Sequence, residues 1–211
     1  MKLACEDSER ARDELLQEVA GRPKARLLER LARAHRFLGE EDEAVRRFRE
    51  AAADVQRVLE RQGRADTYRI ALVAALLHLA GDDDAARPWV ERALRTERDP
   101  GRIAALAYMT GDDDAAAREA RRASEDSDDR PYPLAEALEA LAVARRDRDP
   151  DRASRARETF AELLRADGTP PYDESGAADL SLSDWLLEAA RVEAGLEGGP
   201  PPDPAEVLLD V

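Results

Sequence analysis

Apolar residues recur every three or four positions over most of the chain, the spacing at which side chains share one face of an α-helix. Glycine, proline and acidic residues interrupt this pattern and divide it into segments of helical length. The clearest helices are predicted over residues 7–20, 23–38, 41–62, 100–110 and 183–194. The first of them begins at Asp7 or Ser8, either of which is a good N-cap.

Three turns between the predicted helices share one sequence pattern. Each has a glycine, then a run of acidic residues, then an alanine five positions after the glycine. The turns are residues 38–44, 80–86 and 110–116, which end on Ala44, Ala86 and Ala116. We interpret the acidic runs as helix caps, because aspartate accepts hydrogen bonds from the first N–H groups of a helix and complements its dipole.

Further matches emerge when these three alanines are placed in register. Alanine recurs twelve residues before and seven residues after each of them. A fourth unit aligns on Ala156, where Asp151 takes the place of the glycine. The register predicts alanine at the close crossings between helices: Ala32, Ala44, Ala51, Ala74, Ala86, Ala93, Ala104, Ala116, Ala123, Ala144 and Ala156.

These features resemble the tetratricopeptide-repeat family, which pairs antiparallel helices in units of about 34 residues. The resemblance covers residues 25–170 and implies an all-α, right-handed α-solenoid of antiparallel helix pairs with N- and C-terminal capping helices. It implies a single domain over residues 1–196, followed by a proline- and glycine-rich linker and short apolar tail over 197–211. Within the domain, the expected units are 25–58, 67–98, 99–130 and 137–170, with the C-terminal capping helix at 180–196.

Composition agrees with a helical fold. Alanine accounts for 41 of the 211 residues and isoleucine for two, and alanine is the best helix former whereas β-branched residues favour sheets. No apolar run approaches the roughly 20 residues of a membrane span. Because Cys5 is the single cysteine and cannot form an internal disulfide, we expect a reducing, cytoplasmic compartment.

The charge balance bears on the partners. The chain has 33 basic and 47 acidic residues, which gives a formal net charge of −14. This charge repels phosphate backbones and anionic lipid headgroups, so we expect neither nucleic acid nor membrane as a partner. It would accelerate association with a basic protein.

Motifs for catalysis or cofactor binding are missing from the sequence. It contains no Gly-x-Gly-x-x-Gly, no phosphate-binding loop and no Gly-x-Ser-x-Gly elbow. Two histidines, His35 and His78, with one cysteine do not make up a tetrahedral zinc set. We therefore expect no enzyme, no cofactor and no metal.

One acidic segment keeps a metal-dependent alternative open. Its carboxylates match the first, third, fifth and twelfth places of a calcium-binding EF-hand loop. These are Asp147, Asp149, Asp151 and Glu158. However, Arg152 stands at the sixth place, where the loop requires glycine. A solvated turn between two helices is therefore the preferred interpretation, and a metal-dependent regulator is the alternative.

The resemblance also indicates a binding surface, because tetratricopeptide-like arrays bind partners in a concave groove lined by the first helix of each pair. Tyrosine and arginine, which dominate binding hot spots, are both present among the matching positions. The candidate partner-binding residues are Arg33, Arg36, Tyr68, His78, Tyr108, Arg145 and Arg148, with Ala71, Ala75 and Leu141 between them.

These observations favour a non-enzymatic protein–protein interaction module, a scaffold or adaptor that binds a peptide or protein in its concave groove. An alternative is an immunity- or antitoxin-like inhibitor whose acidic surface, at a net charge of −14, binds a basic toxin.

Overall fold

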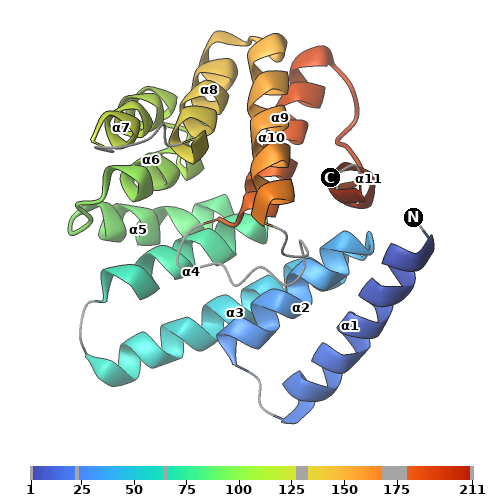
Figure 1. Cartoon of the computed structure of the whole chain (residues 1–211). Helices are drawn as coiled ribbons and strands as arrows, with labels where there is room; N and C mark the ends of the chain where they lie inside the picture. Colours follow the sequence, from blue (N-terminus) through green and yellow to red (C-terminus); the bar gives the residue numbers. More distant parts are fainter. Residues whose placement is uncertain (1, 22–23, 64–65, 127–132, 168–179, 210–211) are drawn as a thin grey trace.

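A computed structural model describes residues 2–21, 24–63, 66–126, 133–167 and 180–209. Within these ranges the chain forms eleven helices and no strand, as the periodicity predicts (Figure 1). The helices are α1 (Lys2–Gly21), α2 (Ala25–Phe37), α3 (Glu41–Gln62), α4 (Thr67–Leu79), α5 (Asp83–Leu94), α6 (Pro100–Met109), α7 (Asp113–Glu125), α8 (Pro133–Asp147), α9 (Pro150–Asp167), α10 (Leu182–Glu197) and α11 (Pro204–Leu209). None of these helices combines the length and the apolar character that crossing a lipid bilayer demands.

The central eight helices form four consecutive pairs, α2–α3, α4–α5, α6–α7 and α8–α9, each joined by a turn of two or three residues. Each helix also packs against the next one along the chain. Figure 1 shows the pairs following one another from the blue α2–α3 pair to the orange α8–α9 pair. The first helix, α1, begins at Lys2 rather than at Asp7 or Ser8, because no glycine or proline interrupts residues 2–7.

The glycine turns reverse the chain in the same way each time. Gly39, Gly81 and Gly111 have φ between +69° and +79°, a left-handed conformation that glycine adopts without steric cost. The next residue then starts the second helix of the pair. Asp82 and Asp112 do so by accepting a hydrogen bond from the backbone N–H three residues further on. Asp82 and Asp112 are therefore helix caps, as predicted, whereas Glu40 at the same place in the first turn makes no side-chain cap.

The fourth turn corrects the expected register. Here the left-handed residue is Arg148, with φ of +57°. The following N–H, of Asp149, donates to the carbonyl of Ala144, as Asp112 N–H donates to Ala107. Asp149 also caps α9 by accepting from Arg152 N–H at 3.1 Å.

The alanine that matches Ala44, Ala86 and Ala116 is therefore Ala153, five residues after Arg148 and fully buried. The prediction of Ala156 at this place, with Asp151 in the place of the glycine, was wrong by three residues, because the turn has no glycine and its left-handed residue is Arg148. The spacing to the preceding unit becomes 37 residues (153−116) rather than 40.

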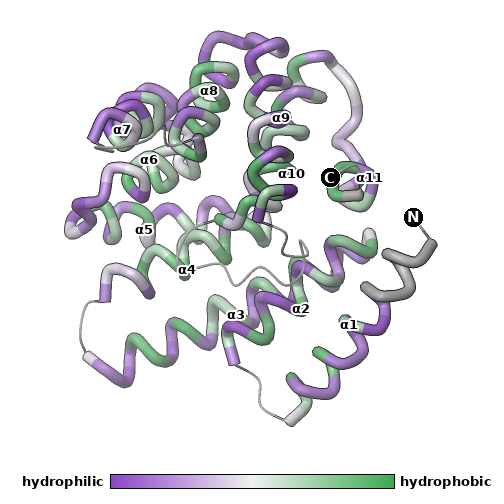
Figure 2. The backbone as a smooth tube through the Cα atoms, in the orientation of Figure 1, coloured by the Kyte–Doolittle hydropathy of each residue, from purple (hydrophilic) through white to green (hydrophobic). Residues whose placement is uncertain are grey.

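The predicted crossing alanines are in the core. Ten of the eleven have at most 3% of their surface exposed, and Ala123 is partly exposed. Phe48, Val90 and Phe160 are fully buried beside them. Alanine at the crossings brings helix backbones close together, and these larger side chains fill the layers between pairs. Figure 2 shows the same division along each helix, where apolar and hydrophilic stretches alternate.

The C-terminal helices return to the beginning of the array. Ser181 starts α10 in a capping box with Asp184, and α10 then packs along α9. Within residues 204–209 of the expected tail, the short helix α11 contacts both α10 and α2, and buries Leu208. The last elements of the chain therefore lie against α2, one of the first.

Candidate functional site

The first helices of the four pairs, α2, α4, α6 and α8, carry equivalent residues near their C-terminal ends. Eight positions before the matched alanines stand Arg36, His78, Tyr108 and Arg145, which we call the end row. All four are among the predicted groove residues. These four predicted residues therefore occupy equivalent positions in the four helix pairs.

The end row links neighbouring pairs through its arginines. Arg36 Nη2 donates to Glu41 Oε1 at 2.8 Å and to the carbonyl of Leu79, in the next pair, at 2.7 Å. Arg145 Nη2 donates likewise to the carbonyl of Tyr108 at 2.8 Å, and its Nε donates to Asp113 Oδ1 at 2.8 Å. These bonds satisfy carbonyls at helix ends, which have no partner within their own helix.

The N-terminal part of α10 lies over α2 and α6. At α2, Arg33 Nη1 donates to Glu29 Oε1 at 2.7 Å and Arg33 Nη2 donates to Asp184 Oδ2 of α10 at 2.8 Å. The Arg33 and Asp184 side chains are 3% and 2% exposed. This buried ion triad connects segments separated by 151 residues in the chain.

The environment shifts the pKa of the two carboxyls of the triad in opposite directions. Burial acts on both by disfavouring the charged form. At Asp184 the charge of Arg33 and hydrogen bonds from Arg33 and Ser181 outweigh burial, so its pKa is lowered. At Glu29 burial outweighs the attraction of Arg33, and the pKa is raised.

At α6, Tyr108 is completely buried against α10. Its ring meets Trp185 edge to face, with 5.4 Å between centroids and 74° between planes. Its hydroxyl donates to Glu188 Oε1 at 3.2 Å. Burial, reinforced by the charge of Glu188, raises the pKa of Tyr108 well above its ordinary value. Phe160 stacks on Trp185 with centroids 6.1 Å apart, so the indole is held from two sides.

The seven predicted groove residues therefore differ in exposure. Arg33, Arg36 and Tyr108 are buried within the chain itself, which corrects the expected open groove at these positions. Tyr68 is 40% exposed, and His78 and Arg145 are half-buried. Arg148 is exposed in the α8–α9 turn. Exposure alone does not show whether a partner binds at these residues, and partner binding stays a prediction.

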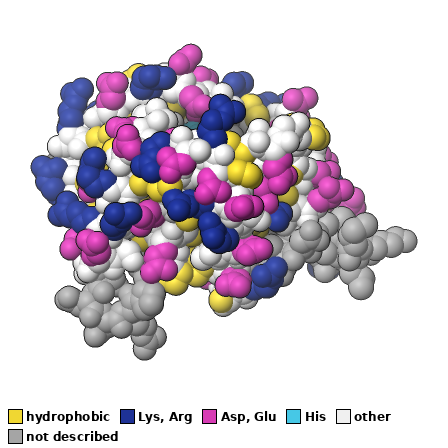
Figure 3. All heavy atoms as spheres, turned by 90° about the horizontal axis from the view of Figure 1, so that it is seen from above, with side chains coloured by type: hydrophobic (Ala, Val, Ile, Leu, Met, Phe, Trp, Pro, Cys, Tyr) yellow, Lys and Arg dark blue, Asp and Glu magenta, His cyan; other side chains and the backbone are white. Residues whose placement is uncertain are grey.

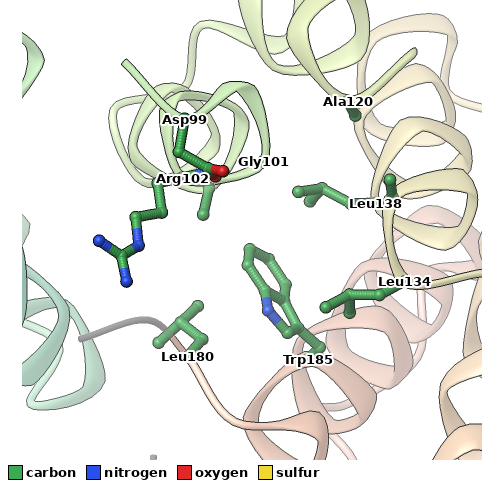
Figure 4. Close-up of a pocket in the computed structure, with 10 residues that line it drawn as sticks. Asp99, Gly101, Arg102, Ala120, Leu134, Leu138, Leu180 and Trp185 are labelled. Atoms are coloured by element: carbon green, nitrogen blue, oxygen red, sulfur yellow. The ribbon is translucent and has the colours of Figure 1, made fainter. Parts of the chain in front are cut away.

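A cavity of about 450 Å³ lies between α6, α8 and the beginning of α10. Figure 4 shows its wall: the indole of Trp185 projects into the space, with Leu134 and Leu138 on one side, Leu180 below, and Asp99 and Arg102 at the start of α6. Gly101, Ala105, Ala120 and Ala135 complete the lining. The cavity exists because glycine and alanine leave space unfilled, and the larger apolar side chains form its border.

Arg102 connects this cavity to Tyr68. Its guanidinium lies over the Tyr68 ring at 5.9 Å from the centroid, and its Nη1 is 3.9 Å from Glu97 Oε2. Sequence reasoning identified Tyr68 but missed Arg102 and the Trp185 side chain as parts of one site. The Asp99-Pro100 start of α6 is the local signal that fixes Arg102 in the first turn.

Two residues of the acidic segment in the metal-dependent alternative have structural roles. Asp149 caps α9, and Asp147 accepts hydrogen bonds from Arg146, which lowers the pKa of Asp147. Across the described ranges, no three His, Cys, Asp or Glu side chains are grouped so as to hold a metal ion. On the face shown in Figure 3, basic side chains lie among acidic ones rather than in a separate patch.

Comparison with known proteins adds no relative to this description. No protein-family model, no curated protein and no solved structure matches the chain.

Proposed function

We propose that the chain is a non-enzymatic protein-interaction module that binds a peptide or protein partner at the cavity between α6, α8 and α10. The observation that carries this proposal is the cavity itself, about 450 Å³ in volume, whose surface combines apolar side chains with polar groups to a similar extent. Its volume is that of a typical ligand site, for which roughly 300–1,000 Å³ is usual.

Tyr68 and Arg102 extend this site onto the surface. In the described part of the chain, Tyr68 is the one large hydrophobic side chain that is exposed. Arg102 stacks on it and also lines the cavity. Tyrosine and arginine beside an apolar pocket supply both contact area and hydrogen bonds, the combination found at the centre of binding interfaces.

The rigidity of the site favours binding. Trp185 is fixed between Tyr108 and Phe160, and α10 is tied to α2 by the Arg33–Asp184 ion pair. A site that is ordered before the partner arrives loses little conformational freedom on binding. The net charge of −14 also favours a partner with basic residues around its contact segment.

Affinity capture from the source cell tests the proposal. The immobilised chain is compared with the double variant Tyr68→Ala/Arg102→Ala and with Arg155→Ala, a control that removes an exposed arginine from α9. We expect at least one protein to be retained by the unchanged chain and by the control, and lost with the double variant. The affinity of the purified partner for the unchanged chain, the control and the double variant is then measured by calorimetry. Equal retention by all three chains contradicts the proposed site.

A further inference from the structure

The indole N–H of Trp185 is an unused hydrogen-bond donor at the wall of the cavity. The residue is 2% exposed and lines the cavity, where its ring projects into the space (Figure 4). Its contacts are with the rings of Tyr108 and Phe160, and no group in the described ranges accepts a hydrogen bond from its Nε1. Because Nε1 is not one of the fully buried atoms that lack a partner, its N–H is open to the cavity and can donate to a molecule bound there.

Asp99 supplies a complementary acceptor at the same cavity. Its Oδ1 accepts from Arg102 N–H at 2.8 Å and so caps α6. Asp99 is exposed, and no described residue donates to its second oxygen, which is therefore free to accept from a bound molecule in place of water. The cavity therefore offers a neutral donor on one side and a carboxylate acceptor on another, with Leu134, Leu138 and Leu180 between them.

We propose that the cavity binds an extended peptide segment through one large apolar side chain of leucine or phenylalanine size. A main-chain carbonyl of the segment accepts from Trp185 Nε1–H, a main-chain N–H donates to Asp99, and the side chain packs among the three leucines. This inference rests on the proposed function and specifies the chemistry of the partner.

Charge complementarity distinguishes a peptide from an aliphatic acid. The carboxylate of an aliphatic acid would meet Asp99 and a protein of net charge −14, and the arginine beside it already has Glu97 at 3.9 Å. A peptide main chain carries both an acceptor and a donor without net charge. Basic residues beside the apolar one would add attraction to the acidic surface.

The indole proton of Trp185 reports directly on this binding. The variant Trp89→Phe leaves Trp185 as the single tryptophan, so a chain labelled with ¹⁵N at the indole gives one cross-peak in a proton–nitrogen spectrum. The probes are N-acetyl-leucinamide, N-acetyl-alaninamide and hexanoate, which separate side-chain size from charge. We expect a saturable downfield shift with N-acetyl-leucinamide and little change with the other two probes.

Two variants make the test specific. Ala105→Leu fills the cavity and should abolish the shift, with Ala53→Leu, on the exposed side of α3, as its control for folding. Asp99→Asn keeps a good helix cap but cannot accept the second bond. It should raise the Kd of N-acetyl-leucinamide by about 3- to 10-fold, the loss expected from one hydrogen bond.

Each other result overturns the inference. A shift with hexanoate alone identifies an aliphatic acid as the ligand, and equal shifts with the leucine and alanine probes exclude selection for a large side chain. No shift with any probe removes the cavity as a peptide site. Capture that depends on Tyr68 and Arg102 would in that case still support the proposed function, so the two failures are distinguishable.

Discussion

Arg33 occupies a position at which the other three pairs have alanine: Ala75, Ala105 and Ala142. A buried guanidinium at this place is stable only while carboxylates neutralise it, and Glu29 and Asp184 do so. Local periodicity does not predict this arrangement, because Asp184 is contributed by a helix 151 residues further along the chain. The expectation that Arg33, Arg36 and Tyr108 line an open groove was therefore wrong, because these side chains are buried within the chain.

Removing Arg33 tests the triad. Arg33→Ala leaves two carboxylates buried without a counter-charge, and we expect a loss of about 3–5 kcal/mol in the free energy of unfolding. Urea denaturation followed by circular dichroism measures it. The triple variant Arg33→Met/Glu29→Met/Asp184→Asn removes all three charges and should recover most of the loss. A triple variant as unstable as Arg33→Ala would show that packing, not charge, is responsible.

The triad also predicts a pH dependence. The pKa of Asp184 is lower in the folded chain than in the unfolded one, so on acidification the carboxylate takes up a proton more readily in the unfolded chain. The free energy of unfolding therefore falls as pH drops below the ordinary value of 3.8. Glu29 acts in the opposite direction: its raised pKa makes the folded chain bind the proton first, so stability decreases as pH rises above 4.5. We expect the free energy of unfolding of the unchanged chain to approach that of Asp184→Asn as the pH is lowered below 3.8. A constant difference would contradict the assignment.

At the scale of elements, alanine and glycine positions were the predictable part of the fold. The crossing alanines recur with the helix period, and glycine in a turn has a direct conformational reason, so both leave a local signal. The fourth turn lacked that signal because Arg148 adopts the left-handed conformation itself. The register error at Ala156 follows from this one residue.

The crossing positions predict a contrast within one helix. Ala51→Leu inserts a larger side chain where α3 is fully buried, and we expect it to destabilise the fold by about 1–3 kcal/mol. Ala53→Leu, two residues away and exposed, should change stability by no more than about 0.5 kcal/mol. Thermal unfolding of both variants gives the comparison, and similar effects at the two sites would be inconsistent with close packing at Ala51.

The strained turn predicts a stabilising substitution. A left-handed conformation costs a non-glycine residue about 1–2 kcal/mol, so Arg148→Gly should gain roughly 0.5–1 kcal/mol after the entropy of glycine is subtracted. Arg155→Gly, on the exposed side of α9, should instead lose about 1 kcal/mol. Opposite signs in denaturant titrations support the strain. A loss at both sites would refute it.

At the scale of the whole molecule, contacts between the two ends distinguish this chain from an open array. In an open array each repeat touches its neighbours alone, and parts can unfold separately. Here α11 lies against α2, Asp184 of α10 pairs with Arg33 of α2, and Trp185 of α10 is packed on Tyr108 of α6. The helix pairs were predictable from sequence, but these long-range contacts were not, since no local pattern specifies which helix faces meet.

Coincident unfolding is the expected consequence. In the Trp89→Phe variant, fluorescence of Trp185 reports on α10, while circular dichroism reports on all helices. Both signals should give the same urea midpoint, because detaching α10 exposes the buried Arg33 and Tyr108 side chains. An earlier midpoint by fluorescence would mean that α10 separates before the rest unfolds.

The distance between Arg33 and Asp184 along the chain has a consequence during synthesis. Arg33 leaves the ribosome 151 residues before its partner. At about 5–20 residues per second, this interval is roughly 8–30 s. Throughout it, the face of α2 that α10 later covers is open in the nascent chain, with Glu29 and Arg33 facing water or a chaperone, and the covered face of α6 with Tyr108 joins it once that helix has been made. The newly made protein thus passes through a period in which it presents a surface that the finished one does not.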